Sequence, residues 1–254
     1  MNNCVLYISP NGRIPRIHDT FKNSDVYYVT HDNPDEGAMS FNKGCNWAYN
    51  RNYLAENITR KYDYYIFIDY DVVFHIDNVE EAIEGCLEEY YPAVMTPVNA
   101  KKEKVIKGKI ENNPCTNNHI KIVHHSLVDY FFPMPCQFGG FWDCCCFFNV
   151  LASAFRKNII HVHDIPCSGL VSSNYSHNSN PKEGHKVSDD MFNWLKPSFG
   201  EKMLVYKDRK SFEAKENAHD NQIEIEKNDS DIVYKFDKSY VDIDNPIFSY
   251  RSVK

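Results

Sequence analysis

Two aspartates separated by one residue, Asp69 and Asp71, end the most strand-like stretch of the sequence. The stretch before them, residues 64–68, is rich in strand formers, and residues 72–74 are again apolar. Two carboxylates at a strand terminus can both reach a hard divalent cation, which completes its shell with water and substrate phosphates. Aspartates also end strands as ordinary solvated turn residues. Because apolar sequence lies on both sides of this pair, we favour the metal-binding interpretation.

A third aspartate, Asp143, lies in residues 138–154, a segment dense in aromatic and small side chains. An unpaired charge is costly in a buried segment, so we expect Asp143 to be either tightly paired or functional. As a functional group it would be a general base, and the ring of Trp142 beside it could stack on a sugar. An equally good alternative is that Trp142 is a core residue and Asp143 caps a helix.

Two histidines, His161 and His163, lie on one face of a predicted strand, because side chains alternate along a strand. Such a pair could bind a metal ion. A half-exposed polar strand face explains the two residues equally well, and the sequence places no third ligand at a convincing distance from them.

Runs of apolar residues separated by polar turns predict the elements that position these side chains. We expect one helix to begin at a Ser40 cap and another at an Asn78 cap. Strands are predicted at residues 4–8, 26–30, 64–74, 93–98, 130–132, 159–165 and 203–206, with strand-like sequence also from Ile120, and helices at 40–62, 78–91 and 188–195.

The alternation of strands and helices up to residue 98 predicts an α/β fold with a mostly parallel central sheet flanked by helices. Ligands bind outside the carboxyl ends of parallel strands, so residues 10–13, 31–37 and 69–71 are expected to meet at one rim. Strand-like sequence resumes after the lysine-rich segment that follows, which predicts a single domain of residues 1–254. The polar stretch 170–187 could form a lid.

The composition of the 254-residue chain excludes several classes of protein. Lys+Arg 28 against Asp+Glu 35 gives a net charge of -7, which leaves no overall positive field for nucleic acid or an anionic membrane surface. The nine cysteines form neither a disulfide framework nor a zinc ribbon. The first apolar run, residues 4–8, is too short for a signal peptide or a membrane span. We therefore expect a soluble, cytoplasmic protein with no nucleic-acid partner and no membrane span.

The Asp-Tyr-Asp sequence after an apolar strand resembles the hallmark Asp-x-Asp of the GT-A glycosyltransferases, enzymes that depend on a metal and a nucleotide-sugar. The Asp-rich turn at residues 30–37 resembles the turn with which that superfamily holds the nucleotide base. The run Asn50, Arg51, Asn52 stands where members often carry Arg-Asn in a helix. The resemblance covers residues 4–98 and extends more loosely beyond them.

The resemblance implies a GT-A, Rossmann-like fold with residues 1–98 as the nucleotide-sugar-binding half and residues 99–254 as the acceptor-binding half. It implies transfer of a sugar from a nucleoside diphosphate sugar, with UDP-sugars favoured, to a hydroxyl of a glycan acceptor. The cofactor would be Mn²⁺ or Mg²⁺, bound by Asp71, Asp69 and His219, although His219 lies in a hydrophilic stretch where a solvated surface histidine is the more common case. The nucleotide-sugar would contact Pro10, Asp32, Arg51, Asp69 and Tyr70.

The sequence Ser188, Asp189, Asp190 resembles the acidic motif that supplies the general base of inverting members. Asp190 is therefore the first candidate for the base, and Asp143 is the second. A single base implies that the enzyme inverts the anomeric centre of the transferred sugar.

Two alternative functions are open. Phosphatases of the haloacid dehalogenase type also use an apolar strand that ends in Asp-x-Asp, with a later Asp-Asp pair and a lysine, which Asp189, Asp190 and Lys186 could mimic. Their motif usually opens the domain, whereas here two predicted strands and a helix come first. A non-catalytic nucleotide-sugar or glycan-binding protein of the same fold would bind metal and donor without turning the donor over.

Overall fold

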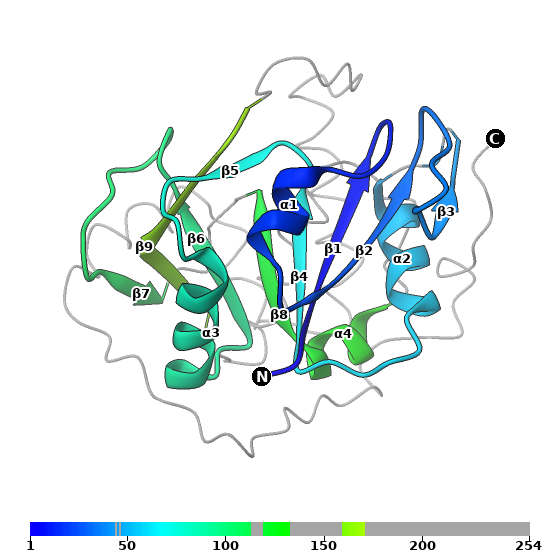
Figure 1. Ribbon diagram of the computed structural model, residues 1–254. Coiled ribbons are helices and arrows are strands. Elements are labelled where there is room, and N and C mark those ends of the chain that lie inside the picture. Colours follow the sequence, from blue (N-terminus) through cyan, green and yellow to red (C-terminus); the bar gives the residue numbers. More distant parts are fainter. Residues whose placement is uncertain (44, 46, 113–118, 133–158, 171–254) are drawn as a thin grey trace, which may run out of the picture.

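The computed structural model describes residues 1–43, 45, 47–112, 119–132 and 159–170 (Figure 1). The elements in chain order are β1 (Asn3–Ser9), α1 (Pro15–Thr20), β2 (Asp25–Thr30), β3 (Ser40–Phe41), α2 (Trp47–Asn57), β4 (Tyr64–Asp69), β5 (Val72–Phe74), α3 (Val79–Tyr90), β6 (Val94–Asn99), β7 (Ile110–Asn112), β8 (Ile120–His124), α4 (His125–Phe131) and β9 (Ile159–Gly169).

The strands form one sheet in the order β3-β2-β1-β4-β8-β6-β9-β5, and β7 pairs with β9 at the side. Strands β3, β2, β1 and β4 run parallel to their neighbours, as predicted for this part of the chain. Strand β8 enters between β4 and β6 and is antiparallel to both. The predicted α/β fold with a central sheet flanked by helices is therefore confirmed, and the sheet is mixed rather than parallel beyond β4.

Alternating side chains of β4 divide the core between the two faces of the sheet. Ile66 and Ile68 belong to an apolar cluster that also contains Ile17 of α1 and Ile83 of α3. Helices α1 and α3 accordingly lie across that face, in front of the sheet in Figure 1. Phe67 points to the opposite face, where Phe132, just after α4, stacks on it with ring centroids 5.6 Å apart. Full burial of such a side chain contributes about 1.5–3 kcal/mol to folding.

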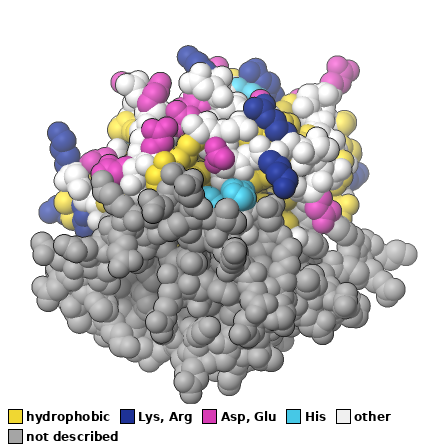
Figure 2. All heavy atoms as spheres, turned by 90° about the horizontal axis from the view of Figure 1, so that it is seen from below, with side chains coloured by type: hydrophobic (Ala, Val, Ile, Leu, Met, Phe, Trp, Pro, Cys, Tyr) yellow, Lys and Arg dark blue, Asp and Glu magenta, His cyan; other side chains and the backbone are white. Residues whose placement is uncertain are grey.

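The amino ends of β1 and β4 lie at the bottom of the sheet in Figure 1, so the carboxyl ends form the upper rim. Seen from below, the described part of the chain shows acidic and basic side chains interspersed with apolar ones (Figure 2). No helix of the described residues has both the length and the apolar character needed to cross a membrane.

The helix predicted over residues 40–62 is shorter than expected at both ends. Ser40 does not cap it; instead Ser40 and Phe41 form β3 and pair with Val29 and Thr30 of β2. The backbone N–H of Asn42 donates to the carbonyl of Thr30 at 2.8 Å, which continues this pairing. The free edge of β2 therefore takes up residues that local helix periodicity assigned to α2, an example of tertiary contacts overriding a local signal.

Two other predicted strands also differ from the structure. The single strand expected over residues 64–74 is β4 and β5, separated at Tyr70 and Asp71. The strand expected over residues 130–132 is wrong, because its first two residues end α4 and the third follows it. Packing favours the helix over the strand here, because α4 brings Phe132 onto the ring of Phe67. The elements predicted at 188–195 and 203–206, and all but the first residue of the predicted lid, lie outside the described residues.

His124 connects β8 to α4 and makes the stability of the fold depend on pH. Its Nδ1 atom accepts a hydrogen bond from the Ser126 N–H at 3.3 Å, and its ring packs edge-on against Tyr64. Burial, reinforced by the neighbouring His125 and opposed by Asp63, lowers the pKa of His124 from 6.5 to about 4. As the pH falls below 6.5, His124 is therefore protonated in the unfolded chain before it is protonated in the folded protein.

We expect the free energy of unfolding to be highest above pH 6.5 and to fall between pH 6.5 and about 4 through this group. Since one pKa unit corresponds to about 1.4 kcal/mol, the loss is about 3 kcal/mol. Urea unfolding of the His124→Asn variant, whose side chain can still cap α4, should show a correspondingly flatter pH dependence. The variant of an exposed histidine, His75→Asn, should keep the wild-type slope; an unchanged slope in His124→Asn would contradict the assignment.

Candidate functional site

The turns that follow β1 and β2 are joined at the rim by backbone hydrogen bonds. The N–H groups of Asp32 and Asn33 donate to the carbonyl of Pro10 at 2.9 and 3.0 Å, and the His31 N–H donates to the carbonyl of Ser9. Parallel pairing of β1 with β2 places both turns at the same end of the sheet. The structure therefore brings together Pro10 and Asp32, two of the residues predicted to contact a nucleotide-sugar.

The two aspartates of the turn after β2 have different surroundings. Asp35 accepts hydrogen bonds from the Tyr28 hydroxyl at 2.5 Å and from the Gly37 N–H at 2.9 Å, and the Tyr28 bond is the main cause that lowers its pKa. Gly12 makes room for it: a Cβ atom there would lie 2.3 Å from an Asp35 carboxylate oxygen. Asp35 thus fixes the turn, whereas the Asp32 side chain is 60% exposed and lies 2.9 Å from Nδ1 of the neighbouring His31.

Asp69 and Asp71 lie at the carboxyl end of β4 and are both buried, at 6% and 3% exposure. The turn that separates β4 from β5 is held from α1: the Arg16 Nε–H donates to the carbonyl of Val72 at 3.0 Å, and the Arg16 guanidinium also bonds the carbonyl of Tyr70. These two carbonyls flank Asp71 in the chain. Arg16, which the sequence did not single out, therefore sets the backbone from which Asp71 projects.

His119 is the functional residue that sequence reasoning missed. Its Nδ1 atom lies 3.1 Å from Oδ2 of Asp69, 50 residues away in the chain. The Asp69 N–H also donates to the His119 carbonyl at 2.9 Å, which continues the pairing of β4 with β8. One ligand atom each from Asp69, Asp71 and His119 lie within 4.8 Å of one another. Only the tertiary pairing of β8 beside β4 reveals this group, which we call the rim triad.

Gly169, the last residue of β9, forms one wall of the rim triad. A Cβ atom on Gly169 would lie 2.7 Å from Cε1 and 2.9 Å from Nε2 of His119, and 3.2 Å from Oδ2 of Asp71. The Leu170 N–H donates to the Asp71 carbonyl at 2.9 Å, and Lys101 Nζ donates to the Gly169 carbonyl at 2.5 Å. Because Gly169 has no side chain, the His119 ring and the Asp71 carboxylate can both lie close against the backbone of β9.

The electrostatics of the rim triad suit a cation. Burial raises the pKa of Asp69, and the charge of Asp71 adds to this effect. The hydrogen bond from His119 and the positive charge of Arg51 oppose it without reversing it. Ionised Asp69 is therefore costly in the metal-free fold, and a divalent cation would remove that cost. Two carboxylates and one imidazole whose ligand atoms lie this close together fit Mn²⁺ or Mg²⁺.

The imidazole of His119 is oriented as in many metal sites. A hydrogen bond from Nδ1 to a carboxylate is the usual way in which a protein selects the tautomer of a metal-binding histidine. Because Nδ1 is engaged by Asp69, the Nε2 atom is the candidate ligand. Both Nε2 and the Asp71 carboxylate lie next to Gly169. On this geometry Asp71 and His119 could bind the metal directly, while Asp69 orients His119.

Helix α2 brings a buried polar surface toward the site. Its residues Asn50, Arg51 and Asn52 are buried, with exposures of 1%, 3% and 1%. Asn50 accepts a hydrogen bond from the Asn42 side chain at 3.0 Å. The guanidinium of Arg51 lies 4.9 Å from the centroid of the Phe67 ring. Arg51 is buried, so its positive charge acts on the Asp69 carboxylate from inside the protein.

Tyr70, predicted to contact the nucleotide-sugar, lies half-buried in the turn between Asp69 and Asp71. Three predicted residues lie outside the described part of the chain: the candidate bases Asp190 and Asp143 and the candidate metal ligand His219. They stay predictions.

We expect the Gly169→Ala variant to fold and to bind Mn²⁺ about tenfold more weakly than the wild type, because its methyl group must displace His119 or Asp71. Isothermal titration of the metal-free protein with Mn²⁺ measures this. Gly85→Ala is the matched control, since Gly85 lies in α3 with nothing within 4 Å of an added Cβ. Wild-type Mn²⁺ affinity in Gly169→Ala would show that the rim triad does not bind the metal.

Comparison with known proteins gives matches in structure alone. No family model matches the chain, and no curated protein matches it in sequence. S. aureus TarS 1-349 in complex with UDP-GlcNAc matches with a TM-score of 0.53 and 12% identity, over 83% of this chain and 74% of that one. GalNAc-T7 with UDP, GalNAc and Mn²⁺ matches with a TM-score of 0.53 and 9% identity, over 86% of this chain and 55% of that one.

A third structure, the mannosyltransferase PcManGT from Pyrobaculum calidifontis in complex with GDP-Man and Mn²⁺, has a TM-score of 0.51 and 11% identity. The match covers 68% of this chain and 58% of that one, so the chain spans little more than half the length of two of these three proteins. At identities this low, the likeness in structure establishes the fold alone, not the activity or the substrate. The described elements and these matches agree in one conclusion: this chain has the GT-A fold of the nucleotide-sugar glycosyltransferases.

Proposed function

We propose that the protein is a metal-dependent glycosyltransferase that moves a sugar from a nucleoside diphosphate sugar to a hydroxyl of a glycan acceptor. One observation carries the proposal: the ligand atoms of Asp69, Asp71 and His119 meet beside Gly169 at the carboxyl end of β4. In an open α/β sheet that is where ligands bind. The exposed Asp32 belongs to a turn at the same end of the sheet, which supports a nucleotide-sugar site along the rim.

The metal would be bound by Asp71 and His119, with Asp69 holding the His119 ring and offering a further oxygen. His119 would join the predicted ligands, among which His219 stays a further candidate outside the described residues. An imidazole ligand favours Mn²⁺ over the harder Mg²⁺, and two structures of the same fold hold Mn²⁺. When bound, such an ion supplies Lewis-acid stabilisation of the charge that grows on the leaving diphosphate.

The nucleotide would lie along the turns after β1 and β2. In this proposal the Asp32 carboxylate accepts a hydrogen bond from the base, the Pro10 turn lines its edge, and Tyr70 lies beside the sugar or ribose. Arg51 is buried and lowers the pKa of Asp69, so its proposed role is to hold the aspartate motif rather than to touch the diphosphate. UDP-sugars are the first donors to test, since TarS and GalNAc-T7 were crystallised with UDP or UDP-GlcNAc.

The acceptor hydroxyl must lose its proton as it attacks the sugar on the face opposite the leaving group. Asp190 is the first candidate for the base that takes this proton, and Asp143 is the second. A single base on that face would give an inverted product. The acceptor-binding half, residues 99–254, would supply either residue.

We expect the Asp71→Asn variant to lose on the order of a hundredfold in Mn²⁺-dependent turnover of its donor, because it removes a proposed metal ligand. Hydrolysis and transfer should be assayed with UDP-GlcNAc, UDP-GalNAc and GDP-Man, with and without Mn²⁺. Asp77→Asn, which removes an exposed carboxylate outside the rim, is the matched control and should keep full activity. Equal activity of the two variants would refute the role given to Asp71.

The same preparations test the alternative functions. A phosphatase would hydrolyse an aryl phosphate without inhibition by UDP, whereas a glycosyltransferase would not. A non-catalytic binding protein would bind Mn²⁺ and UDP with no turnover of any donor, in the wild type as in Asp190→Asn. If Asp190 is the base, Asp190→Asn should keep donor binding and lose transfer.

We expect Mn²⁺ and UDP together to raise the melting temperature more than the sum of their separate effects, because a metal bridges the diphosphate to the rim triad. A ligand at 100 times its dissociation constant stabilises the fold by about 2.7 kcal/mol through mass action. Thermal shift measurements with UDP, GDP and CDP identify the base. Absence of a shift with every nucleotide in the presence of Mn²⁺ would contradict the proposed donor class.

A further inference from the structure

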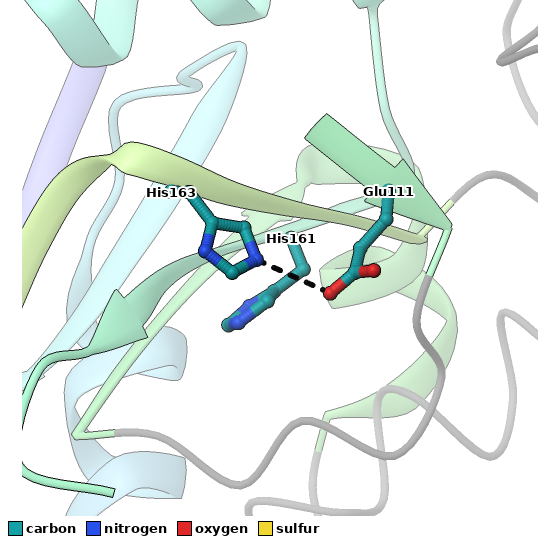
Figure 3. A group of neighbouring side chains, drawn as sticks. All are labelled: Glu111, His161 and His163. Carbon is teal, nitrogen blue, oxygen red and sulfur yellow. Dashed lines mark hydrogen bonds and ion pairs between the residues drawn. The ribbon is translucent and has the colours of Figure 1, made fainter. Parts of the chain in front are cut away.

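A second group of buried titratable side chains lies on β9, away from the rim triad. His161 and His163 are 0% and 3% exposed, and their rings pack edge to face with centroids 5.2 Å apart. The third ligand that the sequence did not reveal is Glu111 of β7, which lies opposite His161 in the antiparallel pairing of β7 with β9. Figure 3 shows Glu111 directed at the two rings.

The ligand atoms of this group lie close to one another. Oε1 of Glu111 lies 3.3 Å from Nε2 of His163. A second carboxylate, that of Glu103, places Oε2 3.0 Å from Nε2 of His161. One ligand atom each of Glu111, His161 and His163 lie within 4.8 Å of one another. Two ligands each about 2.0 Å from a shared tetrahedral ion lie about 3.3 Å apart, so Glu111 and His163 already have the required separation.

The surroundings prepare His161 and both glutamates for a cation. The other ring nitrogen of His161, Nδ1, lies 3.0 Å from the hydroxyl of buried Thr96, a partner that can fix the tautomer with Nε2 as ligand. The carboxylates of Glu103 and Glu111 each lie within hydrogen-bond distance of an imidazole Nε2 atom, so both histidines already face acidic oxygens.

We propose that Glu111, His161 and His163 form a zinc site that is separate from the rim triad. Two imidazoles and one carboxylate are donor groups that Zn²⁺ takes in four-coordinate sites, and water would complete the shell. The site belongs to the other end of β9: Gly169 comes six positions after His163, a distance of at most about 20 Å along an extended strand.

Such an ion would tie β7 to β9, because Glu111 comes from one strand and the two histidines come from the other. It would fasten the segment of residues 103–111 to β9. That segment carries the exposed apolar side chains of Val105 and Ile106, each 42% exposed. The zinc site thus fixes how an exposed apolar loop of the acceptor-binding half is presented.

The Ile106 N–H donates to Nδ1 of His163 at 3.4 Å, so the Nε2 atom of His163 is the ring nitrogen that faces Glu111. The Lys109 ammonium, 2.6 Å from Oε2 of Glu111, leaves Oε1 for the ion.

The test is titration of the chelator-treated full chain with Zn²⁺, followed by Co²⁺ substitution as a probe of geometry. We expect the Asp71→Asn variant, impaired at the rim triad, still to bind one Zn²⁺. In that background Glu111→Gln should weaken binding at least about tenfold and abolish the intense visible bands of four-coordinate Co²⁺. Glu81→Gln, which changes an exposed carboxylate of α3, is the matched control and should change neither.

His163→Gln in the same background provides a second variant, with circular dichroism to verify the fold. The proposal is overturned if Asp71→Asn binds no Zn²⁺, or if Glu111→Gln and His163→Gln bind it as tightly as the control. It does not depend on the proposed glycosyltransferase activity. Loss of donor turnover with retained zinc binding would therefore count against the proposed function alone.

Discussion

The carboxyl end of β4 places two aspartates out of water within one short turn, and the surrounding structure compensates the cost of doing so. Asp69 is stabilised by the imidazole of His119 and by the charge of Arg51, while Arg16 holds the carbonyls on either side of Asp71. These supports come from β8, α2 and α1, elements distant from one another in the chain. The fold converges on this one electrostatic constraint, which a divalent cation would relieve.

The mixed sheet is what makes this arrangement possible. An uninterrupted parallel sheet would place another carboxyl terminus beside β4, whereas antiparallel β8 brings its amino end there and with it His119. Strand β9, by contrast, ends beside Asp71 at Gly169, where the missing side chain lets Asp71 and His119 approach the strand. The other end of β9 carries His161 and His163. One strand thus joins the rim triad to the proposed zinc site.

Much of the first half of the protein follows from local sequence. The run that forms β4, the start of α3 after Asn78 and the turns after β1 and β2 are read from hydrophobic pattern and turn residues, and the structure contains them. The predicted cap is wrong in one respect, because the Asn78 side chain makes no capping hydrogen bond. Predictions failed where contacts with neighbouring elements outweighed the local secondary-structure preference of a segment. Ser40 joined the open edge of β2, and Phe132 came to lie on Phe67 at the end of a helix in spite of strand-forming neighbours.

The sequence alone determined the aspartate pair and its place after a buried strand, because both lie within a few residues and depend on local pattern. Only the tertiary structure decided the partners of that pair. His119 is 50 residues from Asp69, and Glu111 likewise joins His161 and His163 from another strand. Ligands that converge from separate strands share no spacing in the chain, since strand order and register set the distances between them.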